Sequence, residues 1–195
     1  MNLSTYLRLK EQVIERGFQS DIDWCETVGP PATADVFVSE YVWVVLNSGM
    51  KAEVARRIWD RVWTAVRRGN LVSTVFRHPG KARAIQDALA RKEELYRNYL
   101  LAGDKLAYLE SLPWIGAITK YHLAKNFGLD VAKPDRHLQR LADRYNTTPE
   151  AMCKALSDQC GDRIGTVDYV IWRAASLSIL STRQTNTADF KGILT

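Results

Sequence analysis

A single aspartate, Asp135, stands where a carboxylate could take part in catalysis. It follows Pro134 and precedes Arg136, His137 and Leu138, where a helical pattern begins. This position predicts a helix N-cap, because an aspartate side chain accepts hydrogen bonds from the free N–H groups of a first helical turn. A carboxylate held there can also stabilise a developing cation or deprotonate a water molecule. The capping role and the catalytic role do not exclude each other.

The segment before Asp135 predicts two short helices joined by a tight turn. The first helix ends at Leu112, the turn runs over residues 113–116, and the second helix continues to about Phe127. Gly116 would let the second helix begin with free backbone N–H groups pointing outward, which is a site for an anion such as a nucleic-acid phosphate. Apolar residues at helical spacing mark the face to be buried, and these are Leu109, Leu112, Ile115, Ile118 or Thr119, and Leu123.

The order L-P-x-I-G, helix, P-D-x-H-L resembles the helix-hairpin-helix (HhH-GPD) superfamily of DNA glycosylases. The resemblance implies that the hairpin, residues 105–127, binds the DNA backbone and that Asp135 is the catalytic aspartate. It implies no cofactor, although it allows a structural monovalent cation at the hairpin. Trp114 stands where relatives usually have glycine. The residues matched to the backbone contact are Trp114, Gly116, Ile118, Thr119 and Lys120.

The resemblance implies hydrolysis of the N-glycosidic bond of a damaged or modified base in double-stranded DNA, after the nucleotide has flipped out. Bifunctional relatives carry a lysine two residues after the hairpin glycine, where this chain has Ile118. Lys120 is rotated from that position by about 200°, and Lys133 is the better candidate outside the motif. We therefore expect a monofunctional enzyme that uses water and leaves an abasic site, with Lys133 or Lys120 as the alternative source of lyase activity.

Several biological roles are compatible with this resemblance. Alkylated, deaminated or oxidised bases would make the protein a base-excision repair enzyme. Substituted hydroxymethylcytosine of viral DNA would make it a defence enzyme. A non-catalytic helix-hairpin-helix protein that binds or recognises damaged DNA is the alternative class. Asp135 within P-D-x-H-L argues against that class, because a pure binding protein could use any capping residue there.

Residues outside the motif are candidates for contacts with the DNA bases. The turn at residues 47–50 lies between two predicted helices, where relatives insert a side chain into the duplex. Asn47 and Met50 are therefore wedge candidates, although an ordinary capped turn explains the same residues. The base pocket could include an aromatic side chain from a polar stretch, carboxylates on apolar helices, and a lysine beside the aspartate. These candidates are Trp24, Glu40, Lys133 and Asp168.

Helical spacing of apolar residues predicts an all-α chain of about ten helices that position these residues. The main helices are expected over residues 4–16, 36–46, 51–68, 81–101, 135–145 and 167–181, with Asp35 as an N-cap and a short turn over 21–27. The resemblance arranges them in two lobes that flank a DNA-binding cleft. A six-helix-barrel-like lobe would comprise residues 35–128 with the hairpin. Residues 1–34 and 129–195 would form a second, discontinuous lobe of the same functional unit.

The charge distribution suits a protein with one polyanion-binding side. The net charge is +5, but residues 51–97 hold twelve basic and five acidic side chains, whereas residues 1–50 hold three and seven. The three scattered cysteines, Cys25, Cys153 and Cys160, indicate reduced thiols and cannot supply four iron–sulfur ligands. Histidines and cysteines show no metal-ligand spacing. With no signal-peptide or membrane-span pattern, we expect a cytoplasmic, nucleoid-associated monomer whose partner is double-stranded DNA.

Overall fold

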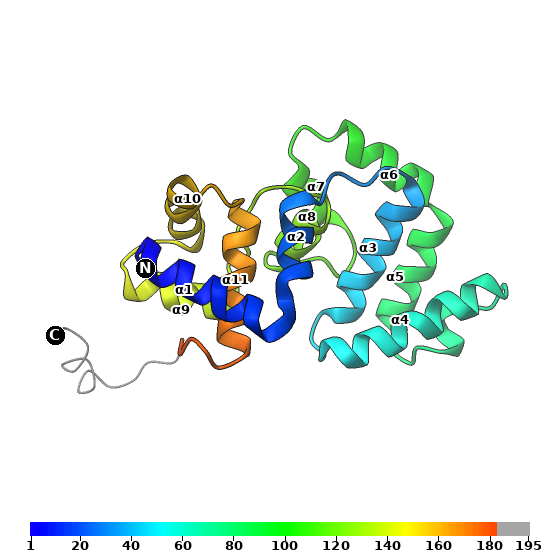
Figure 1. Ribbon diagram of the computed structural model, residues 1–195. Helices are drawn as coiled ribbons and strands as arrows, with labels where there is room; N and C mark the ends of the chain where they lie inside the picture. The colour runs from blue at the N-terminus through cyan, green and yellow to red at the C-terminus, as the bar shows by residue number, and fades with distance from the viewer. Residues whose placement is uncertain (183–195) are drawn as a thin grey trace. The chain divides into compact units, whose positions relative to one another are not determined.

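The computed structural model describes residues 1–182 as a succession of helices, without a β-strand in that range (Figure 1). This confirms the expected all-α class for the described residues. Within the same residues, no helix combines the length and the apolar character needed to span a bilayer. The helices are α1 (Leu3–Val13), α2 (Gln19–Thr27), α3 (Ala34–Asn47), α4 (Ala52–Arg67), α5 (Pro79–Ala90), α6 (Lys92–Leu101), α7 (Lys105–Ser111), α8 (Thr119–Asn126), α9 (Arg136–Arg144), α10 (Pro149–Cys160) and α11 (Ile164–Ser176). A π-helical turn, η1 (Ile14–Phe18), and a 3-10 turn, η2 (Val72–Thr74), complete the set.

Two helix starts differ from the expectation. Thr33, and not Asp35, is the N-cap of α3, because the Thr33 hydroxyl accepts a hydrogen bond from the Val36 N–H at 3.2 Å. Asp35 instead lies in the first turn of that helix. The stretch expected to be a short turn over 21–27 is the nine-residue helix α2, which buries Ile22 and Cys25.

Two helix ends were also predicted wrongly. The expected helix over 81–101 is divided at Arg91, whose φ of −109° and ψ of 18° interrupt the helical backbone between α5 and α6. The last helix ends at Ser176 and not at residue 181, and the left-handed φ of 59° at Ser178 fits that ending. Residues 183–195, which the expected second lobe includes, lie outside the described residues.

The chain divides into two compact units. Unit 1 comprises Met1–Glu26 and the chain from Ala132 onward, and unit 2 comprises Thr27–Val131. In unit 2, the apolar helix α3 contacts α4, α5, α6 and α8. Each fully buried large apolar side chain contributes about 1.5–3 kcal/mol to stability. In unit 2 these side chains include Phe37, Leu46, Ile85, Leu109, Leu123 and Phe127.

Unit 1 is built around α11, which contacts α1, α9 and α10. The buried residues of α11 follow helical spacing, as expected for a helix with one face on a core, and they include Val167, Val170, Ile171 and Ala174. They pack with side chains from the N-terminal segment and from α9 and α10, including Tyr6, Leu9, Leu138, Leu141 and Leu156.

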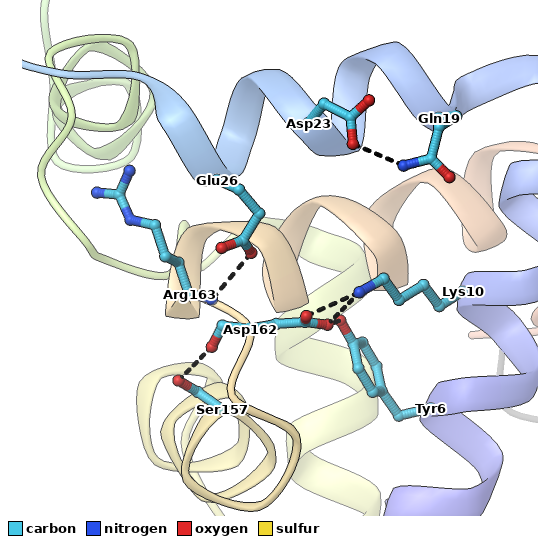
Figure 2. A network of polar contacts seen from close by, with 8 residues as sticks. All are labelled: Tyr6, Lys10, Gln19, Asp23, Glu26, Ser157, Asp162 and Arg163. Carbon is cyan, nitrogen blue, oxygen red and sulfur yellow. Dashed lines mark hydrogen bonds and ion pairs between the residues drawn. The ribbon is translucent and has the colours of Figure 1, made fainter.

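A polar network centred on Asp162 also joins the N-terminal segment to the rest of unit 1 (Figure 2). The Asp162 carboxylate accepts hydrogen bonds from the Tyr6 hydroxyl at 2.5 Å and from Lys10 Nζ at 2.7 Å. Glu26 of α2 accepts one from the Arg163 N–H at 3.0 Å. Burial, reinforced by Asp162, raises the pKa of Tyr6 far above its usual value, so this hydroxyl is a donor at neutral pH.

Candidate active site

The hairpin of α7 and α8 is held on the core of unit 2 by its apolar face and by a hydrogen bond from α3. Four of the apolar residues predicted for its inner face are buried, and these are Leu109, Leu112, Ile115 and Leu123. The Tyr41 hydroxyl, from the buried side of α3, donates a hydrogen bond to the carbonyl oxygen of Pro113 at 2.8 Å. This bond satisfies both a buried hydroxyl and a turn carbonyl, so it sets the position of the turn.

The turn retains free backbone donors, but the N–H of Gly116 is not among them. That N–H donates to the Thr119 hydroxyl at 2.7 Å. The N–H groups of Ala117, Ile118 and Thr119 have no acceptor in the part of the chain that the structure describes. A Cβ built on Gly116 would meet no heavy atom within 4 Å. An anion can therefore approach the start of α8 closely.

Trp114 has a backbone conformation that glycine adopts more readily than other residues. Its φ is 65°, in the left-handed region that residues other than glycine rarely occupy. The indole packs on Gly80, where an added Cβ would lie 2.5 Å from Trp114 Cζ2. Its ring centroid is 4.9 Å from that of His78. The start of α5 therefore supports the hairpin turn.

Lys120 and Ile118 have different environments on the hairpin. Lys120 Nζ lies 2.6 Å from Glu110 Oε2, so this lysine is paired across the hairpin. The hydrogen bond to Glu110 raises the pKa of Lys120 and keeps its amine protonated. A paired cation binds phosphate less strongly, and a protonated amine is not a nucleophile. Ile118 is 42% exposed.

Lys81, which no sequence pattern singles out, joins the hairpin turn to the 47–50 turn. It is only 6% exposed, and its Nζ donates to the carbonyl oxygen of Ser48 at 2.6 Å. The same ammonium lies 5.9 Å from the centroid of the Trp114 ring. Burial lowers the pKa of Lys81. In sequence, Lys81 is one of twelve basic residues between 51 and 97, and no local signal separates it from the others.

The wedge candidates lie at the end of α3. Asn47 is the last residue of that helix, and its carbonyl accepts a hydrogen bond from the Met50 N–H at 3.3 Å. Met50 is half-buried and packs against the core of unit 2. Insertion of Met50 into a duplex would therefore require this turn to move away from the core.

Asp135 caps α9, as the sequence predicts. Its Oδ1 accepts hydrogen bonds from the N–H groups of His137 at 2.8 Å and Leu138 at 3.1 Å. Its Oδ2 accepts no hydrogen bond from any residue of the described range. The side chain is half-buried. One carboxylate oxygen therefore orients the group, and the other is left for an external partner.

The loop that carries Asp135 is fixed by Asp168. This carboxylate is 1% exposed on α11, and its Oδ2 accepts a hydrogen bond from the Lys133 N–H at 2.9 Å. The carbonyl oxygen of Lys133 in turn accepts one from the Asp135 N–H at 2.7 Å. Two base-pocket candidates, Lys133 and Asp168, thus lie beside Asp135, and the Asp168 carboxylate positions the backbone of this loop.

The remaining pocket candidates, Glu40 and Trp24, lie on the helices α3 and α2. Glu40 is half-buried on α3 and accepts a hydrogen bond from Asn126 Nδ2 at 2.8 Å. Burial raises the pKa of Glu40, while Asn126 and the charge of Arg56 oppose that rise. Trp24 lies on α2 and is 45% exposed. Glu40 thus belongs to unit 2, whereas Trp24, Lys133 and Asp168 belong to unit 1.

Possible metal ligands include side chains of the described residues and carbonyl oxygens of the hairpin. Over residues 1–182, no three His, Cys, Asp or Glu side chains come together in a way that could hold a metal ion. At the hairpin, the carbonyl oxygens of Trp114 and Ile115 accept no hydrogen bond from described residues. Carbonyl oxygens are the ligands that a monovalent cation uses, so these two would hold one if it binds.

Comparisons with protein-family models, with curated proteins and with solved structures gave no match to this chain. Membership of the helix-hairpin-helix superfamily is therefore part of the proposal that follows.

Proposed function

We propose that this protein is a monofunctional helix-hairpin-helix DNA glycosylase that removes an altered base from double-stranded DNA. The observation that carries the proposal is the geometry of Asp135. One carboxylate oxygen is fixed by two backbone N–H groups, and the other has no partner among the described residues. A carboxylate with one oxygen held by hydrogen bonds and the other able to bind an external group is suited to face a cationic transition state.

In the proposed reaction the bond between C1′ of the sugar and the base nitrogen breaks. The base leaves with the bonding electrons and takes up a proton, and water adds its oxygen to C1′. The sugar gains oxocarbenium character on the way, as in glycoside hydrolysis. At about 4 Å and an effective dielectric near 20, a carboxylate stabilises that charge by about 4 kcal/mol, or roughly three decades in rate. Binding of the flipped nucleotide and assistance to the leaving base would supply the rest.

The hairpin supports the DNA-binding half of the proposal. Its free N–H groups at residues 117–119 and the open space over Gly116 suit a phosphate oxygen. The excess of seven positive charges over residues 51–97 adds attraction for a polyanion. The proposal requires the hairpin and Asp135 to engage the same duplex.

The test is incubation with a panel of duplexes, each carrying one alkylated, deaminated, oxidised or substituted hydroxymethylated base. Alkali then converts abasic sites into strand breaks. We expect one class of base to be excised, and we expect Asp135→Asn to reduce that excision by about three decades while duplex affinity is retained.

Asp104→Asn is the matched control, because Asp104 caps α7 by accepting a hydrogen bond from the Ala107 N–H. Asn caps helices about as well as Asp, so both variants should fold. Normal excision by Asp135→Asn would contradict the catalytic assignment. Tight binding of damaged duplex without excision by the unmodified protein would instead support the non-catalytic damage-recognition alternative.

A further inference from the structure

We propose that Trp114 is a stacking platform for an unstacked nucleobase. The hairpin would then bind single-stranded or gapped DNA more tightly than its phosphate contacts alone allow. The inference rests on the proposed function for one point only, that the polymer is a nucleic acid. It does not depend on Asp135 or on base excision.

The indole is partly exposed and partly packed. Trp114 is 47% exposed, and its contacts with His78, Gly80 and Lys81 all come from one short segment at the start of α5. Nearly half of the side chain is therefore open to solvent. A rigid indole fixed by close packing on a glycine is a preorganised surface for another flat ring.

The conformation of Trp114 carries two costs for the hairpin. A φ of 65° costs free energy for any residue with a Cβ, and glycine would adopt it without that cost. Nearly half of a large apolar side chain is also left in water. Packing on the start of α5 uses only the other half of the side chain. An external partner for the exposed half would offset these costs.

The chemistry of the hairpin tip favours an unstacked base over an intact duplex. Lys120 is paired with Glu110, and Lys81 is buried, so neither is a free cation beside the ring. The large exposed side chains at the tip are Trp114 and Ile118, which are both apolar. An intact duplex presents phosphates outward and keeps its base faces covered. A single strand presents base faces to the ring and phosphates to the N–H groups of residues 117–119.

Charge complementarity favours a nucleic acid over a protein as the partner. The supporting segment His78–Lys81 lies within the basic stretch of residues 51–97, which attracts a polyanion. Stacking on an aromatic side chain tolerates any base, because every base has a π-face. The platform would therefore add affinity without sequence preference.

The experiment measures binding of the full chain to three fluorescein-labelled DNAs by anisotropy. These are an oligo-dT strand, a duplex with a short gap, and an intact duplex of the same length. We expect Trp114→Ala to weaken binding to the strand and the gapped duplex by about five- to a hundredfold, and to weaken binding to the intact duplex less, because an intact duplex keeps its base faces covered. Trp114→Phe should retain most of the affinity, because a ring remains.

Tyr145→Ala is the matched control, since Tyr145 is an aromatic residue of similar exposure, 52%, at the end of α9. It should leave all three affinities unchanged. If Trp114→Ala fails to fold, Trp114→Gly carries the test. Glycine adopts the φ of 65° without strain, so this variant keeps the conformation of the turn while it loses the ring.

An equal loss for all three DNAs, or no loss at all, would overturn the platform. Absence of any DNA binding would overturn it as well. These outcomes are separate from a failure of the proposed function. Excision can be absent, or independent of Asp135, while the Trp114 variants still show the selective loss on single-stranded and gapped DNA.

Discussion

At the scale of single residues, the two oxygens of Asp135 have different tasks. Oδ1 accepts hydrogen bonds from the N–H groups of His137 and Leu138, and Oδ2 accepts none from the described chain. The two hydrogen bonds fix the rotation of the Asp135 carboxylate. Asp168 fixes the preceding backbone by accepting a hydrogen bond from the Lys133 N–H. A catalytic carboxylate needs this kind of support, because a displaced charge stabilises the transition state less.

Glu40 gives a prediction on stability and pH. Burial raises its pKa from the ordinary value of 4.5, so the folded protein disfavours the charged form. The stability that Glu40 contributes is fully present below pH 4.5 and is lost as pH rises through the raised pKa. Glu40→Gln keeps an oxygen for Asn126 and removes the charge. We expect this variant to be more stable than the unmodified protein at neutral pH and similar to it below pH 4.5.

Urea unfolding between pH 4 and pH 8 checks this prediction. The difference in free energy of unfolding between Glu40→Gln and the unmodified protein should grow as the pH rises. Glu53→Gln removes the same charge from an exposed position on α4 and should show no such growth. A difference that stays constant with pH would mean that Glu40 is not destabilised by its burial.

At the scale of elements, the hairpin could be predicted because its signals are local. The apolar stripe, the proline, the turn glycine and the N-cap of α9 all act within a few residues. The structure confirms the Asp135 cap and four buried positions of the stripe, whereas Ile118 is exposed and Thr119 is half-buried. The Tyr41–Pro113 and Lys81–Ser48 hydrogen bonds join residues 72 and 33 positions apart. The periodicity of apolar residues carries no information about such long-range contacts. The hydrogen bonds that hold the hairpin turn could therefore not be predicted.

The hairpin also gives a prediction about Gly116. The space over this residue is open and its φ is not left-handed, so Gly116→Ala should fold with a stability change within about 1 kcal/mol. The new methyl group would project where a phosphate approaches. We expect affinity to fall by about tenfold, as for the loss of one hydrogen bond to a charged group, equally for damaged and undamaged duplexes.

Gly103→Ala is the control for this change. Gly103 precedes α7, has open space around its Cβ position and has no left-handed φ. Its substitution makes the same chemical change outside the turn and should leave duplex affinity unchanged. A loss that appears only with damaged DNA would place Gly116 near the base and not near the backbone.

At the scale of the whole molecule, each unit has its own core, and only unit 1 is assembled from distant parts of the chain. Composition and helical periods predict the all-α class. They do not reveal how α1 meets α11 or that Asp162 binds Tyr6 and Lys10. Those contacts join residues more than 150 positions apart, and only the folded chain brings them together.

The environments of two lysines from different parts of the chain predict the product. Lys120 is held protonated by Glu110. Lys81 has a lowered pKa but is buried, and its ammonium binds Ser48. Neither presents a free neutral amine, and Ile118 stands where the resemblance would place a lysine nucleophile. We therefore expect no Schiff base with the sugar.

Borohydride trapping checks this expectation. Enzyme and substrate are mixed with borohydride, and a covalent protein–DNA species is sought by denaturing electrophoresis. We expect no adduct, and an abasic strand that stays intact until alkali breaks it. An adduct would contradict the monofunctional reaction, and its disappearance in Lys133→Ala, Lys120→Ala or Lys81→Met would identify the nucleophile. If the adduct is absent while alkali-dependent breaks accumulate, the attacking group is water, which Asp135 is oriented to assist.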